Sequence, residues 1–122
     1  MTRIKQPKGS FFHAAKRAQP HVESAHRELK KVSPNRENAR AALQKAQLSL
    51  PAPEQIPAVL DADDDRKAVL TDMDLAGRSV RDAINFLDGV KPDDREARRA
   101  VKQAKDAIER IIKACGGSDS DL

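Results

Sequence analysis

The chain has 122 residues, a mass of 13.4 kDa and a formal net charge of +4, and 34% of its residues are charged. This length suits one domain with a single core and excludes two ordinary domains. Aromatic residues make up only 2% of the chain, whereas Ala, Leu, Lys, Arg and Glu are abundant. This composition favours helices over strands, and regular apolar spacing argues against disorder. The sequence therefore predicts an all-α protein.

The cysteine content and the hydropathy pattern exclude several classes of protein. Cys115 is the only cysteine, so an intrachain disulfide and every cysteine-based zinc pattern are excluded. No run of apolar residues follows the basic N-terminus, and none reaches the length of a membrane-spanning helix. A single thiol suits a reducing compartment. We therefore expect a cytoplasmic protein that does not enter a membrane.

The N-terminal quarter predicts a flexible basic arm at 1–9 and a first helix over about 10–32. Ser10 is the expected N-cap of that helix. Pro20 interrupts the pattern, and the helix is expected either to kink there or to restart. The apolar positions of this segment follow the alternating spacing of three and four that is typical of a coiled coil; they are Ala15, Ala18, Val22, Ala25, Leu29 and Val32.

A second helix is predicted over about 34–50, with Ser33 as its N-cap and Pro34 in its first position. The segment that follows, 51–57, contains three prolines and is expected to be an extended linker.

Two further helices are predicted over about 61–88 and 93–115. Gly89 is expected to end the third helix with a left-handed backbone. Asp93 and Glu96 have the spacing of a capping box at the start of the fourth helix. Glycines at 116 and 117 should stop that helix and leave an acidic tail at 116–122.

These four amphipathic segments predict one domain over 10–115, an antiparallel four-helix bundle. Two long helical hairpins that pair with a second copy would give the same pattern, so a homodimer is an alternative. Many positions of the apolar stripes are alanines, which allow helices to approach closely. Val80 and Ile108 lie in the middle of the two most apolar stripes and are the expected core anchors.

The charge is unevenly distributed along the chain. Residues 1–50 carry a net charge of +8 (11 basic minus 3 acidic), residues 51–94 carry −6 (5 minus 11), and residues 95–122 carry +2 (7 minus 5). A solvated surface and internal neutralisation by the acidic third helix are two non-functional interpretations. The functional interpretation is a basic binding surface formed by the arm and the outer ridge of the first helix. Its candidate residues are Arg3, Lys5, Lys8, Lys16, Arg17, Arg27, Lys30 and Lys31.

Motifs for metals, cofactors and catalysis are incomplete. The acidic run of 61–65 has the first ligand positions of a calcium loop, but Arg66 occupies the place of the required glycine. Glu23 and His26 form one Glu-x-x-His unit, which lies off the apolar stripe, whereas di-iron bundles use two such units facing inward. No nucleotide-binding loop is present. We therefore expect no cofactor and no catalytic site.

The sequence favours a non-enzymatic helical interaction protein that acts as an adaptor, regulator or inhibitor by binding a partner macromolecule, most simply another protein. The alternative is a protein that binds the phosphate backbone of nucleic acids, without sequence specificity, through its basic N-terminal half.

Overall fold

A computed structural model describes residues 8–51, 64–89 and 91–119 of the chain. All regular secondary structure in these ranges is helical, which confirms the predicted all-α class. The four helices are α1 (Lys8–Leu29), α2 (Arg36–Ser49), α3 (Asp64–Leu87) and α4 (Asp94–Asp119).

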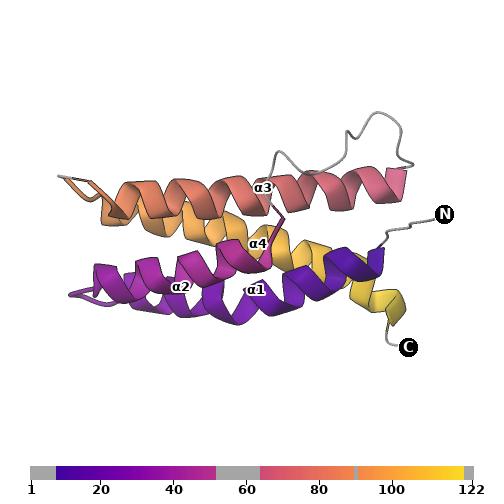
Figure 1. Ribbon diagram of the computed structural model, residues 1–122, viewed down its shortest axis with the longest axis horizontal. Helices are drawn as coiled ribbons and strands as arrows, with labels where there is room; N and C mark the ends of the chain where they lie inside the picture. Colours follow the sequence, from indigo (N-terminus) through magenta and orange to yellow (C-terminus); the bar gives the residue numbers. More distant parts are fainter. Residues whose placement is uncertain (1–7, 52–63, 90, 120–122) are drawn as a thin grey trace.

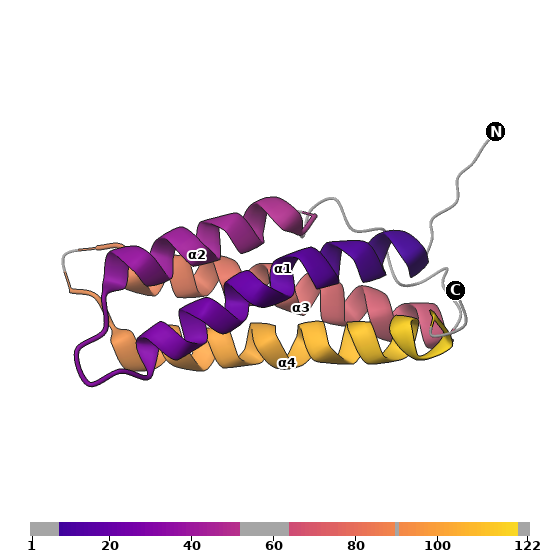
Figure 2. The same cartoon turned by 90° about the horizontal axis from the view of Figure 1, so that it is seen from below.

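The helices pack side by side with successive helices running in opposite directions (Figures 1 and 2). Helix α1 packs against α2 and α4, and α3 packs against the same two helices. A smaller contact joins α1 to α3 across the centre. The apolar stripe of each helix is therefore covered by its neighbours in the same chain.

The core consists of the predicted stripes and is rich in small residues. Twelve of the 24 buried apolar residues are alanines. Val80 and Ile108 are completely buried, as expected for core anchors. Because alanine side chains are short, close approach of the helix backbones is what fills the interior. The larger side chains with essentially no exposed surface are Leu43, Leu70, Met73, Ile108, Ile111, Val22, Val80 and Val101.

The predicted bounds of the first helix are wrong at both ends. Helix α1 begins at Lys8, so Ser10 lies inside the helix rather than at its N-cap. It ends at Leu29, and Val32, predicted to continue the apolar stripe, is fully exposed. The residue before a proline disfavours helical backbone, which weighs against continuing the helix up to Pro34. Pro20 lies inside α1, which runs through it as one helix.

The start of the second helix also differs from the prediction. Asn35 is the N-cap of α2, and its side-chain oxygen accepts a hydrogen bond of 3.0 Å from the Asn38 backbone N–H. Ser33 and Pro34 belong to the preceding turn. The Glu28 carboxylate holds that turn by accepting a bond of 2.9 Å from the Asn35 backbone N–H. This contact from the end of α1 places the cap two residues later than predicted.

The turn between α3 and α4 follows the prediction closely. Helix α3 ends at Leu87, and Gly89 has a φ of +145°, in the positive region that favours glycine. Asp93 caps α4, because its carboxylate accepts a bond of 3.0 Å from the Glu96 backbone N–H. In a complete capping box, the Glu96 side chain would accept a bond from the Asp93 backbone N–H. Here that N–H donates instead to the Phe86 carbonyl oxygen at 2.8 Å.

The predicted end of the fourth helix is wrong, because α4 continues through the glycines at 116 and 117 to Asp119. Glycine in a helix costs only about 1 kcal/mol relative to alanine, which by itself does not end a helix. None of the described helices has the length and apolar composition needed to cross a membrane.

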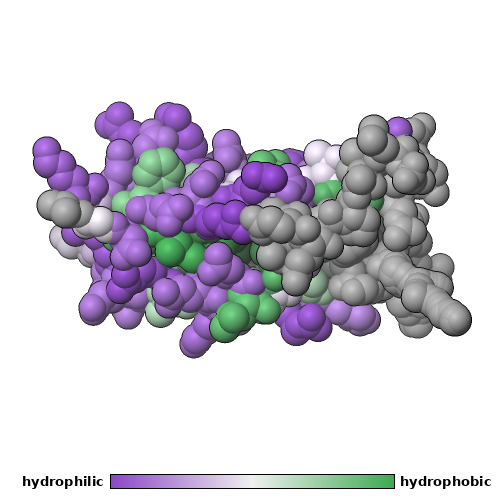
Figure 3. All heavy atoms as spheres, turned by 45° about the horizontal axis from the view of Figure 1, so that its top comes forward, coloured by the Kyte–Doolittle hydropathy of each residue, from purple (hydrophilic) through white to green (hydrophobic). Residues whose placement is uncertain are grey.

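The surface of the described residues is mainly polar. On the face shown in Figure 3, hydrophilic side chains cover most of the part that is not grey, and apolar atoms appear between them in small areas. The large apolar side chains described as exposed are Val32, Leu48 and Phe86, which come from three different segments.

Candidate functional site: a basic groove between α1 and α4

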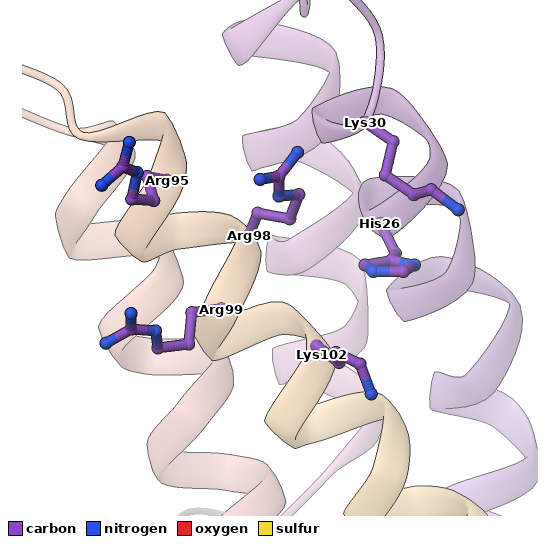
Figure 4. Close-up of a pocket in the computed structure, with 6 residues that line it drawn as sticks. All are labelled: His26, Lys30, Arg95, Arg98, Arg99 and Lys102. Atoms are coloured by element: carbon purple, nitrogen blue, oxygen red, sulfur yellow. The ribbon is translucent and has the colours of Figure 1, made fainter.

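A hollow of about 550 Å³ lies along the seam between α1 and α4. We call it the basic groove, because among the described residues every side chain that lines it is basic and none is a carboxylate. In Figure 4, Arg98 and Lys102 reach from α4 toward α1, whereas the head groups of Arg95 and Arg99 turn away from α1. The lining residues are His26, Lys30, Arg95, Arg98, Arg99 and Lys102.

Helical periodicity explains how two helices supply this lining. Arg95, Arg98, Arg99 and Lys102 have the spacing i, i+3, i+4 and i+7, which places them on one face of α4. That face lies beside the buried stripe of α4, so the head groups stay in solvent. His26 and Lys30 are four residues apart, one turn, at the end of α1. Because α1 ends where α4 begins, the two basic faces lie at the same end of the bundle (Figure 2).

Three cations of the groove have no ion-pair partner among the described residues: Lys30, Arg95 and Arg98. The other two are held weakly at the surface. Arg99 lies 3.5 Å from the Glu96 carboxylate, and Lys102 lies 3.1 Å from Asp106. Exposed pairs of this kind contribute about 0 to 1 kcal/mol and can be exchanged for another anion.

Two further carboxylates near the groove, Asp94 and Glu28, are bound by other parts of the bundle. Asp94 accepts two hydrogen bonds, of 2.7 and 2.9 Å, from the guanidinium of Arg36. Glu28 accepts from the Asn35 backbone N–H and from the Lys31 ammonium at 3.0 Å. The bond from Asn35, followed by that from Lys31, lowers the pKa of Glu28. These contacts leave Lys30, Arg95 and Arg98 without a carboxylate partner among the described residues.

The positive region ends at Lys105, whose ammonium donates to the Glu109 carboxylate at 2.9 Å. This hydrogen bond raises the pKa of Lys105 above its ordinary value. The groove residues of α4 span eight positions, or seven steps along the helix, from Arg95 to Lys102. At a rise of 1.5 Å per residue, this stretch is about 10 Å long.

A second, smaller hollow adjoins the first at the end of the bundle. It has a volume of about 200 Å³ and extends to the turn between α1 and α2. Arg95 and Arg98 line both hollows, and the second is lined in addition by Leu29, Lys31, Val32, Pro34 and Asp94. The two hollows therefore share Arg95 and Arg98, but the second also contains apolar side chains and one carboxylate.

His26 is the half-buried member of the groove. Its pKa is lowered below the ordinary value of 6.5, first by burial and then by the positive charges of Lys30, Lys105, Lys102 and Arg98. A lowered pKa favours the neutral imidazole near neutral pH.

The lowered pKa of His26 predicts a loss of stability in acid. Above pH 6.5 the imidazole is neutral in both the folded and the unfolded chain. As the pH falls through 6.5, the unfolded chain takes up the proton first, so the free energy of unfolding should decrease. Urea denaturation at about pH 7.5 and about pH 5 should show a smaller decrease in the His26→Gln variant than in the parent. His21→Gln, which removes an imidazole outside the groove, is the control; an equal change in both variants would contradict this assignment.

The structure places the candidate residues predicted from the sequence in different parts of the surface, and of those that it describes only one lines the basic groove. Lys30 lies in the basic groove, and Lys31 pairs with Glu28 at the adjoining turn. Lys16 is exposed, with its ammonium 5.9 Å from the centre of the Phe12 ring. The exposed residues Arg17 and Arg27 line neither hollow. Lys8 is the first residue of α1, and Arg3 and Lys5 lie outside the described residues.

The basic residues of α4 were missed because the net charge of 95–122 is only +2. A signal was present in the spacing of Arg95, Arg98, Arg99 and Lys102, which puts four cations on one helical face. The contribution of α1 could not be derived in this way, because it depends on which helices become neighbours. Asp61 and Asp63 of the rejected calcium pattern lie outside the described residues. Elsewhere, within the described ranges, no three His, Cys, Asp or Glu side chains gather as metal ligands would.

Comparisons with protein-family models, with curated proteins and with solved structures found no match to this chain.

Proposed function

We propose that this protein is a non-enzymatic helical module that binds an anionic macromolecule in the basic groove. The observation that carries the proposal is the basic groove, which among the described residues is lined only by basic side chains, three of them without an ion-pair partner. Unneutralised cations in a concave site raise the local concentration of anions and the rate of their association.

The chemistry of the lining favours binding over catalysis. Arginine guanidinium groups hold phosphates and carboxylates in a fork geometry but stay protonated, which makes them poor proton-transfer groups. His26 is the one side chain of the groove suited to proton transfer near neutral pH, and no carboxylate or hydroxyl group accompanies it in the lining.

Neutralising the unpaired cations should abolish most of the binding. In the variant Lys30→Gln/Arg95→Gln/Arg98→Gln, we expect the affinity for heparin, used as a general polyanion, to fall by about tenfold or more at low salt. The physical reason is that fewer counterions are displaced on binding, so the salt dependence should flatten as well. Isothermal titration calorimetry at two ionic strengths measures both effects.

A charge-matched control locates the site. The variant Lys16→Gln/Arg17→Gln/Arg27→Gln also removes three positive charges, all from exposed positions of α1 outside the groove. It should retain most of the parent's affinity. An equal loss in both variants would mean that only net charge matters, and cleavage of the bound polymer would contradict the non-enzymatic assignment.

A further inference from the structure

We propose that the anionic partner is a single-stranded nucleic acid, with about three successive phosphates bound by Lys30, by Arg98 and, on the side of α4 turned away from α1, by Arg95, and with a base stacked on the His26 imidazole. This inference rests on the proposed function and specifies the partner of the same groove.

The composition of the groove favours a nucleic acid over a protein. Protein partners derive most of their affinity from a few apolar or aromatic anchors in pockets. Among the described residues that line the basic groove, none is Leu, Ile, Val or Phe; its apolar surface comes from the stems of the Lys and Arg side chains and from the His26 ring, so it offers no aliphatic side-chain pocket to a protein anchor. A phosphate backbone requires only the cations that are present.

The number of cations and the length of the groove agree with a short stretch of backbone. Three basic side chains lack an ion-pair partner among the described residues. The groove covers about 10 Å of α4, and one strand of a double helix carries one phosphate per about 3.4 Å of axis. Both values indicate about three phosphates.

The position of His26 favours a single strand over a duplex. Single-stranded nucleic acids expose the faces of their bases, which stack on aromatic rings and on guanidinium planes inside basic grooves. The His26 ring lines the groove between Lys30 on its own helix and Lys102 on α4 (Figure 4). Its lowered pKa keeps the ring neutral near neutral pH and so suited to stacking. The bases of a duplex are already stacked on one another and could not use this ring.

The smaller hollow, which shares Arg95 and Arg98 with the basic groove, indicates the direction in which the bound strand continues. Arg95 and Arg98 line both hollows, and the smaller one leads to the turn between α1 and α2, where Lys31 lies. At the opposite end, Lys105 is paired with Glu109 at 2.9 Å, whereas Arg95 and Arg98 have no ion-pair partner among the described residues. The strand should therefore leave the basic groove toward the turn end of the bundle.

Fluorescence anisotropy with three labelled probes tests this inference: an oligothymidine of about eight nucleotides, a duplex of about the same length, and a glutamate peptide of equal charge. We expect the single strand to bind best, with a slope of log affinity against log salt of about −2 for three phosphates. His26→Ala should weaken single-strand binding by about fivefold to hundredfold and leave duplex binding unchanged, whereas His26→Phe should retain it. Circular dichroism of both variants checks that the fold is intact.

The outcomes separate the two proposals. Tight binding of the glutamate peptide without binding of the oligonucleotide would overturn the nucleic-acid assignment and leave the anion-binding function standing. Equal binding of single strand and duplex, unaffected by His26→Ala, would overturn the single-strand assignment alone. Failure of all three probes and of heparin to bind at low salt would overturn both proposals.

Discussion

Ile108→Ala is expected to lower the free energy of unfolding by about 2 to 5 kcal/mol. Ile108 is completely buried in the middle of α4, the helix that packs against both α1 and α3. Truncation removes apolar surface from the interior and leaves a cavity. Because a packed core relaxes only partly around such a cavity, the loss exceeds that of the removed apolar contacts alone. Domains of this size have a total stability of about 5 to 15 kcal/mol, so the loss is a large part of it.

Urea denaturation monitored by circular dichroism measures this loss. The control is Val32→Ala, which shortens a side chain of the same type that is fully exposed after the end of α1. The control should change the free energy of unfolding by no more than about 0.5 kcal/mol. If Ile108→Ala were as stable as the parent, the register of α4 described here would be wrong; a destabilised Val32→Ala would place Val32 in the core after all.

Ala104→Leu is expected to destabilise the fold by about 1 to 3 kcal/mol, although it adds apolar surface. Ala104 has no exposed surface and lies on the buried stripe of α4. Half of the buried apolar residues are alanines, so the helix backbones approach closely and leave no room for a branched side chain. The extra carbons must push the helices apart or enter strained rotamers.

The matched control is Ala41→Leu, at an exposed position of α2. Alanine and leucine have similar helix propensities, so this variant should unfold at nearly the same urea concentration as the parent. Equal stability of Ala104→Leu and Ala41→Leu would show that the interior around Ala104 has room for a larger side chain, contrary to the packing described here.

The sequence alone predicted the class and number of the elements. Apolar residues at spacings of three and four form a stripe on any helix, so positions such as Val80, Met73 and Ile108 had to be buried. Local signals that act within one turn were also reliable. Asp93 caps α4 because its carboxylate meets the backbone N–H three residues later, and Gly89 takes a positive φ that other residues avoid.

The end of α1 and the start of α2 were decided by a contact that a local pattern does not contain. The stripe predicted that α1 would continue to Val32, but the Glu28 carboxylate binds the Asn35 backbone N–H and turns the chain earlier. Asn35, rather than Ser33, then occupies the cap of α2. Glycines at 116 and 117 resemble a stop signal, although their cost of about 1 kcal/mol each does not end a helix by itself.

The basic groove shows most clearly what only the tertiary structure decided. The sequence determined that α1 and α4 each carry cations, because residue type and helical spacing fix which face of a helix is charged. It could not determine that the end of α1 lies beside the start of α4, since residues about seventy positions apart meet only through packing. Nor could it show that Arg36 occupies Asp94 and so leaves Arg95 and Arg98 unneutralised. Residue type fixes each charge, but the electrostatic potential at a binding site depends on which charges the fold pairs with one another and which it leaves unpaired.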